Sequence, residues 1–282
     1  MVDVASANRI SAAGIVALLV ALLLATPAAA QPAQWPDLGS GASVWRGIGG
    51  GEFIPIPGGP APVTQDPRYS RVANAQSRIT GEQPNYRIGD VSNPNLMQWA
   101  RDVMQQDNVE VLAGKIAFSP RSTCSPGGVP GFILMGGGGM HVLQTADQVV
   151  MIHEGDAQMR RIHLDVPHSE NPQPSWYGDS VGHYEGDTLV VDTIGLNDKS
   201  FIDAYRTPHT ENLHVIERWR LLDGGEVLEV LVTVVDLGTF NQPWQALRRF
   251  QREASPLEEM RCAENNEQFY SGFMPIADSF DF

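Results

Sequence analysis

Basic residues are scarce in this chain of 282 residues. It contains 19 Lys and Arg against 33 Asp and Glu, which gives a formal net charge of -14 at pH 7. Nucleic-acid backbones are bound by basic surfaces, so this deficit argues against nucleic acid as a partner. The same negative charge disfavours binding to anionic lipid and favours solubility.

Cysteine is rarer still, with only Cys124 and Cys262 in the whole chain. Neither lies in a Cys-x-x-Cys arrangement, which argues against a zinc or redox role. In an oxidising compartment, two cysteines in such a chain predict a disulfide that closes a very long loop. The alternative is a pair of inert buried thiols.

Long apolar runs are also missing, except for one at the start. Arg9 precedes the apolar run 12–25, and the small residues Pro27-Ala28-Ala29-Ala30 follow it. This pattern predicts a signal peptide over residues 1–30, cleaved before Gln31. The run is short for a membrane span, although an uncleaved anchor is the alternative. We therefore expect a periplasmic or secreted protein with no membrane span after cleavage.

Several catalytic and cofactor motifs are absent. The glycine run 136–139 leads into Met140-His141-Val142 and not into the Gly-Lys-Ser/Thr of a phosphate loop. No Gly-x-Ser-x-Gly elbow surrounds Ser180, which disfavours a serine hydrolase. No His-x-His pair occurs on any expected strand, so the sequence predicts no metal site and no cofactor.

The part of the chain that is present divides at turn-forming residues. Residues 31–92 are dense in Gly, Pro, Ser and Asn and predict an irregular arm, which Trp35, Trp45 and Phe53 could anchor to a folded body. A helix and linker are expected over 93–123, a β-rich domain over 124–262 and a tail over 263–282. About 250 residues after cleavage fit one large all-β domain or two small ones.

Two helices are predicted by capping signals. Asn93 as the cap and Pro94 at the first helical position begin one helix, and the box Ser255-Pro256-Leu257-Glu258 begins a short second one that carries Cys262. The first helix is expected to pack through one apolar face formed by Leu96, Trp99, Ala100, Val103 and Met104.

Eight short strands separated by turns are predicted after residue 141. Their spacing, with mostly hairpin connections, favours a mainly β fold: an antiparallel up-and-down, barrel-like (calycin-like) sheet of about eight strands. Closure of such a sheet removes its exposed edges. The expected strands are 142–146, 149–153, 159–164, 181–184, 188–194, 213–221, 227–236 and 245–252.

Alternation along two of these strands predicts which face lies inside. On 227–236, Leu228, Val230, Val232 and Val234 share one face, which we expect to be interior. On 213–221, Glu217 shares a face with apolar residues. A carboxyl group inside a barrel must be paired, hydrogen-bonded or protonated, so Glu217 is either a functional carboxylate or part of an ion pair with an arginine such as Arg161 or Arg249.

One stretch resembles a known family. The sequence Gly182-His183-Tyr184-Glu185-Gly186-Asp187-Thr188-Leu189-Val190-Val191-Asp192-Thr193, followed by Pro208-His209 and His214-Val215-Ile216-Glu217-Arg218, is similar to a family of exported bacterial proteins. That family shows an aromatic residue before Glu-Gly-Asp-Thr-Leu-Val-Val-Asp-Thr and a Glu-Arg pair on a later strand. Tyr184 departs mildly from it, because tryptophan is commoner there. The resemblance covers about half the chain, from Cys124 to Cys262, and implies export and a β-rich fold without a particular activity.

Candidate site residues combine titratable and aromatic groups near this stretch. For acid-base chemistry we expect Glu217 as base, His183 or His214 as proton donor, and Arg218 or a tyrosine to stabilise developing negative charge. Asp192 is a second candidate carboxylate, because it interrupts an apolar strand. For ligand binding we expect Trp176, Tyr184, Trp219 and His209.

Three functions are compatible with these features. The first is an exported protein that binds a small, largely apolar molecule inside the barrel, because barrels of about eight strands have room for one small ligand. The second is a cofactor-free lyase, isomerase or hydrolase that uses general acid and base residues in the same cavity. The third is a structural envelope protein.

Overall fold

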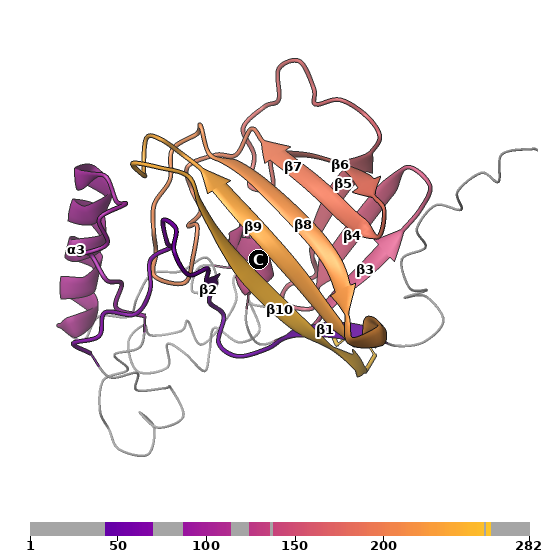
Figure 1. Cartoon of the computed structure of the whole chain (residues 1–282), viewed down its shortest axis with the longest axis horizontal. Helices are drawn as coiled ribbons and strands as arrows, with labels where there is room; N and C mark the ends of the chain where they lie inside the picture. Colours follow the sequence, from indigo (N-terminus) through magenta and orange to yellow (C-terminus); the bar gives the residue numbers. More distant parts are fainter. Residues whose placement is uncertain (1–42, 70–86, 114–123, 136–137, 257, 261–282) are drawn as a thin grey trace, which may run out of the picture. The chain divides into compact units, whose positions relative to one another are not determined.

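The computed structural model describes residues 43–69, 87–113, 124–135, 138–256 and 258–260. The predicted signal peptide 1–30, Trp35, Cys262 and the tail 263–282 lie outside the described residues. The predicted Cys124–Cys262 disulfide involves one of these residues and stays a prediction. Within the described part, the chain forms a β-barrel and one α-helix (Figure 1).

The strands follow one another around the barrel in sequence order, with one exception. Nine of them close a mixed barrel in the order β1-β3-β4-β5-β6-β7-β8-β9-β10, with β10 returning to β1. The short β2 pairs with β10 beyond the end of β1. The strands are β1 (Ser43–Gly47), β2 (Ile54–Pro55), β3 (Met140–Gln144), β4 (Gln148–His153), β5 (Gln158–Leu164), β6 (Asp179–Glu185), β7 (Thr188–Ile194), β8 (His214–Leu222), β9 (Val227–Val235) and β10 (Trp244–Ala254).

The mainly β, barrel-like fold predicted from the strand spacing is confirmed, with two differences. The barrel has an additional strand, β1, which lies within the predicted irregular arm 31–92 and pairs with both β10 and β3. Trp45 on β1 is 1% exposed, so the aromatic anchor of this segment is part of the barrel itself.

The second difference is one parallel pair, β5 with β6. The other strand pairs are antiparallel. A parallel neighbour needs a connection long enough to carry the chain back to the start of the previous strand. The long link 165–178 provides this connection, and it forms the projecting loop beside β5 and β6 in Figure 1.

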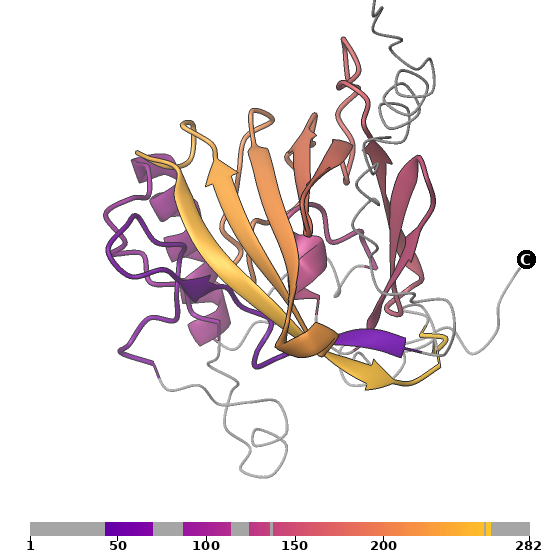
Figure 2. The ribbon, with the colours of Figure 1, turned by 45° about the vertical axis from the view of Figure 1, so that its right-hand side comes forward.

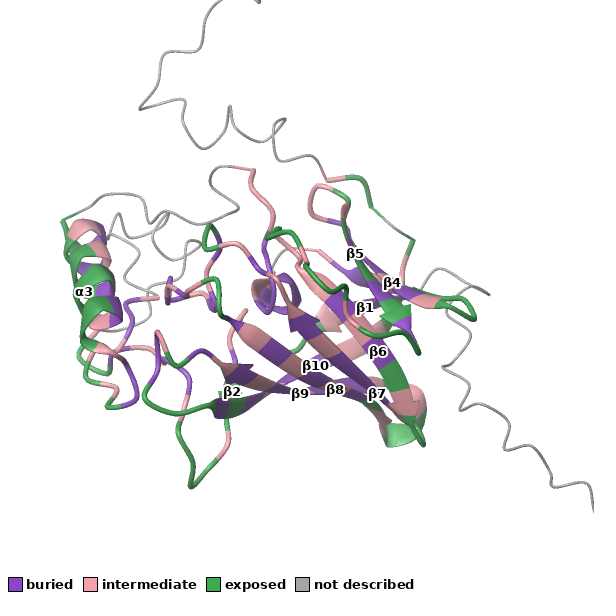
Figure 3. Ribbon diagram, turned by 90° about the horizontal axis from the view of Figure 1, so that it is seen from above, coloured by how far each residue is buried: buried purple, intermediate pink, exposed green. Residues whose placement is uncertain are grey.

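Side chains alternate between a buried and a more exposed face along the strands, as the striped ribbon of Figure 3 shows. The inward positions of β9 are as predicted, because Leu228, Val230, Val232 and Val234 are all fully buried. The outward Glu229 is also buried, since Arg220 and Arg249 both hold its carboxylate on the outer surface.

A short 3-10 helix, η2 (Gly131–Leu134), lies within the curve of the sheet (Figure 2). Phe132 packs edge-on against His153 and Tyr177, with ring centroids 6.0 and 5.8 Å apart. The inward-facing Arg248 donates to the carbonyl oxygen of Ile133 at 3.3 Å. These contacts fasten η2 to β10 and β4.

The helix α3 (Gln98–Leu112) begins later than predicted, and the face that it buries differs from the predicted one. Asn93 does not cap it: its side-chain oxygen accepts from the amide of Asn95, and Asn95 hydrogen-bonds Gln242 in the β9–β10 link. Docking to that link holds 93–97 outside the helix, whose N-cap is Met97. Its buried residues are Ala100, Met104, Asn108 and Val111, whereas Trp99 and Val103 are about two-fifths exposed at 39% and 41%.

The predicted helix at Ser255 is absent from the described residues there. Strand β10 runs on to Ala254, and Met260 then forms a parallel bridge with Gly155. Residues 255, 256 and 258–260 are not helical, and the bridge at Met260 is isolated. A second short 3-10 helix, η3 (Asp223–Gly225), forms the β8–β9 turn.

Candidate functional site

A buried ion pair joins two strands of the barrel from the inside. Arg160 on β5 and Glu217 on β8 lie 2.6 Å apart, Nη2 to Oε2, and neither side chain is exposed at all. Glu217 therefore lies on the interior face, as its strand pattern predicted. Its partner differs from both expected arginines, because Arg161 is exposed and Arg249 pairs with Glu229 on the outer surface.

Two hydroxyl groups complete the polar cluster around this pair. Arg160 Nη2 also lies 2.9 Å from Thr193 Oγ1 and 3.3 Å from Ser180 Oγ, and these two hydroxyls are 2.9 Å from each other. Ser180 and Thr193 are cross-strand partners on β6 and β7, the strands between β5 and β8. The four residues, here called the interior polar cluster, thus come from four consecutive strands of the sheet.

The interior polar cluster leaves several polar atoms without a hydrogen-bond partner among the described residues. These are Arg160 Nε and Nη1 and both carboxylate oxygens of Glu217, whose contact with Nη2 has the distance of an ion pair without the angle of a hydrogen bond. A buried donor or acceptor with no partner costs about 1–3 kcal/mol, and more when it is charged. The cluster is therefore incompletely satisfied by the described protein groups.

Apolar side chains surround these atoms. Val191 and Val232 stand directly opposite Glu217 on the neighbouring strands, and both are fully buried. Trp219, two residues along β8 on the same face, is also fully buried and stacks on Phe250 with a centroid distance of 6.3 Å. The inward-facing neighbours of Glu217 on β7, β8 and β9 are thus apolar.

Arg160 was missed by the sequence analysis, although a signal for it exists. On β5, Arg160, Ile162 and Leu164 alternate with exposed residues and are all buried. The two apolar members define the inward face, so the same alternation places the guanidinium inside the barrel.

The predicted proton donor His183 does not share the interior with Glu217. His183 is exposed on β6 and its Nε2 lies 3.3 Å from Glu185, which also pairs with Arg218 at 2.7 Å. Arg218 is next to Glu217 on β8 and faces the opposite side of the sheet. His183 and Arg218 are therefore members of an outer-surface network with Glu185.

Asp192 and His214 also meet on the outer surface. His214 Nε2 and His168 Nε2 both contact Asp192 Oδ1, at 2.8 and 2.9 Å, and His168 Nδ1 lies 3.3 Å from Asp179. Burial alone would raise the pKa of Asp192, but the hydrogen bonds from the two histidines outweigh it and lower that pKa. The hydrogen bond to Asp192 raises the pKa of His214. The sequence missed His168 because it lies in the link 165–178, where no periodicity marks it.

His209 lies in the link 195–212, and both of its ring nitrogens have hydrogen-bond partners. Ser200 and His209 Nε2 are 3.0 Å apart, and His209 Nδ1 is 3.0 Å from the carbonyl oxygen of Thr210. The carbonyl can only accept, so Nδ1 carries the proton and Nε2 accepts from the Ser200 hydroxyl. Burial lowers the pKa of His209, which favours this neutral form.

The three aromatic residues predicted to line a cavity have different positions. Trp219 is in the core, and Tyr184 lies on the inward-facing register of β6 and packs against the core. Burial raises the pKa of the Tyr184 hydroxyl. Trp176 lies in the link 165–178 and is half-buried. Trp219 and Tyr184 are thus the predicted ligand residues that accompany Glu217 on the interior face.

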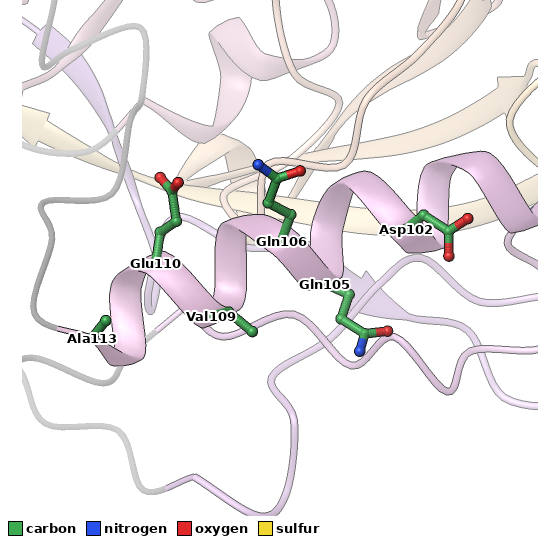
Figure 4. Close-up of a pocket in the computed structure, with 6 residues that line it drawn as sticks. All are labelled: Asp102, Gln105, Gln106, Val109, Glu110 and Ala113. Carbon is green, nitrogen blue, oxygen red and sulfur yellow. The ribbon is translucent and has the colours of Figure 1, made fainter.

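A separate hollow of about 530 Å³ is lined by residues of α3, whose side chains Figure 4 draws. Among the described residues, this lining is mostly polar or acidic, with Val109 as its one large apolar side chain, so it does not suit an apolar ligand. The lining residues are Asp102, Gln105, Gln106, Val109, Glu110 and Ala113.

No protein-family model matches the chain, and no curated protein matches its sequence. Within the described ranges, no helix combines the length and apolar character that a membrane span requires. The same ranges contain no group of three or more His, Cys, Asp or Glu arranged to hold a metal ion.

Proposed function

We propose that this protein binds a small, largely apolar molecule inside its β-barrel, with one polar group of that molecule at the interior polar cluster. The observation that carries the proposal is the set of unsatisfied atoms on Arg160 and Glu217. Buried polar groups in native proteins are nearly always paired, so atoms left unpaired by the described residues mark a place for a further polar partner.

The apolar lining supports the rest of the proposal. A ligand of this kind places its polar group at a few well-defined donors and acceptors and buries its remainder against hydrophobic and aromatic side chains. Val191, Val232 and Trp219 supply such a surface next to Glu217. A closed barrel also holds these side chains on paired strands, which limits the entropy lost on binding.

An acid-base enzyme has less support than a binding protein. That function requires Glu217 and His183 or His214 to approach the same substrate, yet the histidines contact Glu185 and Asp192 on the outer surface. Glu217 instead pairs with the Arg160 guanidinium at 2.6 Å, and neither of these histidines lies on that face of the sheet.

We further propose that the protein is exported to the periplasm or secreted, as a member of the bacterial family that its Glu185-Gly186-Asp187 region resembles. The N-terminal pattern before Gln31 and the paired cysteines support this assignment.

The binding function is tested by titrating the full chain with small apolar compounds while tryptophan fluorescence and heat are recorded. We expect saturable binding with one molecule per chain. Val232→Phe adds bulk directly opposite Glu217 and should abolish binding, whereas Thr233→Phe, on the outer side of the same strand, should leave it intact. Equal binding by the two variants would contradict an interior site.

A further inference from the structure

We infer that the interior polar cluster selects a ligand whose polar group is uncharged and carries a hydrogen-bond donor beside an acceptor, as a hydroxyl does. This inference rests on the proposed binding function and names the chemical class of its ligand. It is carried by which atoms of Arg160 and Glu217 are already engaged and by the charge that the barrel interior already holds.

The engaged atoms leave both kinds of hydrogen-bonding group free. Arg160 Nη2 is occupied by Glu217, Ser180 and Thr193, so Nε and Nη1 remain as donors. Glu217 Oε1 remains as an acceptor. A hydroxyl satisfies one group of each kind, because its oxygen accepts from the guanidinium while its hydrogen is donated to the carboxylate.

The charge of the pair argues against an ionised ligand. Guanidinium and carboxylate cancel one another, and both are excluded from water. A carboxylate ligand would lie beside Glu217, and an ammonium ligand beside Arg160, so either would add an unbalanced charge to a water-excluded region.

Arg248, a further inward-facing arginine, is hydrogen-bonded elsewhere in the barrel. It faces inward from β10, but its Nε donates to the carbonyl oxygen of Ile133 and its Nη1 to those of Ile48 and Gly50, at 2.8–3.3 Å. Its guanidinium is thereby directed to the backbone just after β1 and within η2.

Three compounds with one alkyl tail test the inference: hexan-1-ol, hexanoate and hexylamine, titrated into the full chain by calorimetry at about pH 7.5, where the last two are ionised. We expect hexan-1-ol to bind with a Kd at least about tenfold lower than either ion. Equal affinities, or tighter binding of an ion, would overturn the inference and leave the binding function standing. Saturable binding by none of the three would overturn both.

Changing the charge of the cluster should change the preferred ligand. Glu217→Gln leaves Arg160 without its carboxylate, so hexanoate should become the tightest ligand and should raise the Tm of this variant more than that of the wild type. Should hexan-1-ol stay the tightest ligand of Glu217→Gln, the charge argument fails.

A second variant tests the inference even if Glu217→Gln does not fold. Arg160→Met with Glu217→Leu replaces both members of the pair by apolar side chains, which proteins tolerate better than a broken pair. This double variant should bind hexan-1-ol at least about tenfold more weakly than the wild type, because the donor and the acceptor that the hydroxyl uses are gone. An unchanged affinity for hexan-1-ol would show that the Arg160–Glu217 pair does not recognise the polar group, and would overturn the inference.

Discussion

Arg160 and Glu217 meet inside the barrel although their strands are not neighbours, since β6 and β7 lie between β5 and β8. The contact therefore spans the curved inner surface, and Ser180 and Thr193 on the intervening strands both lie within hydrogen-bond distance of the same guanidinium nitrogen. This relationship links four consecutive strands through their inward-facing side chains.

Breaking this pair should destabilise the fold strongly. Glu217→Leu or Arg160→Met leaves one buried charge without its partner, which costs about 3–5 kcal/mol in the free energy of unfolding. The double variant should recover most of the loss. Urea unfolding of the four proteins measures the coupling, with the exposed neighbour Arg161→Met as control. Additive losses in the double variant would mean that the two charges do not interact.

A charge placed on the interior face of β9 should also destabilise the fold severely. Val232 is fully buried, so Val232→Asp introduces an unpaired carboxylate and should cost more than about 3 kcal/mol. Thr233→Asp puts the same residue on the outer side of the same strand and should cost much less. Thermal unfolding compares them, and similar Tm values would indicate that the two faces are assigned the wrong way round.

The contact between Asp192 and His214 should make stability depend on pH. The pKa of His214 is raised, so its contribution is complete below the ordinary histidine value of 6.5 and is lost as the pH rises through the higher folded pKa. The pKa of Asp192 is lowered, so its contribution is complete above 3.8 and is lost as the pH falls through the lower folded pKa. The contact thus contributes most between these two values.

Asp192→Asn tests this dependence. The Tm difference between wild type and variant should be larger at about pH 5 than at about pH 9. Asp187→Asn, in the exposed β6–β7 turn, should show no such difference. A Tm difference for Asp192→Asn that grows with rising pH would contradict the assigned directions of the pKa shifts.

The mature chain should begin near Gln31 and carry the Cys124–Cys262 disulfide. Intact mass of protein recovered from an exporting host, before and after reduction and thiol labelling, measures both features. Labelling of two thiols without prior reduction would contradict the predicted disulfide. A retained leader would indicate an anchored protein.

Much of the barrel could be predicted because period-two alternation and turn residues are local signals. The strand predicted from them over 188–194 has the same bounds as β7, and they correctly predicted Glu217 and Val232 on the inner face. Strand β1 was missed because five residues beside a glycine run carry little pattern, and its strand pairing is with β10 and β3, far along the chain. Local patterns do not encode such long-range pairing.

The candidate site was predicted less completely, in part because it depends on which strands become neighbours. Glu217 was expected to need a partner, but the choice of Arg160 over Arg161 depends on which face of β5 is buried and on the parallel β5–β6 pairing. Sequence proximity suggested that His183 and His214 could work with Glu217. The strand register places those histidines and Glu217 on opposite sides of the sheet. Successive side chains on a strand point to opposite faces, so a shift of one residue decides which side a group occupies.

The most direct test of an interior binding site is a crystal structure of the full chain grown with hexan-1-ol. We expect the alcohol oxygen within hydrogen-bond distance of Arg160 and Glu217, with the alkyl chain against Val232 and Trp219. Density for the alcohol confined to the outer surface, such as the hollow on α3, with none in the barrel, would contradict the account.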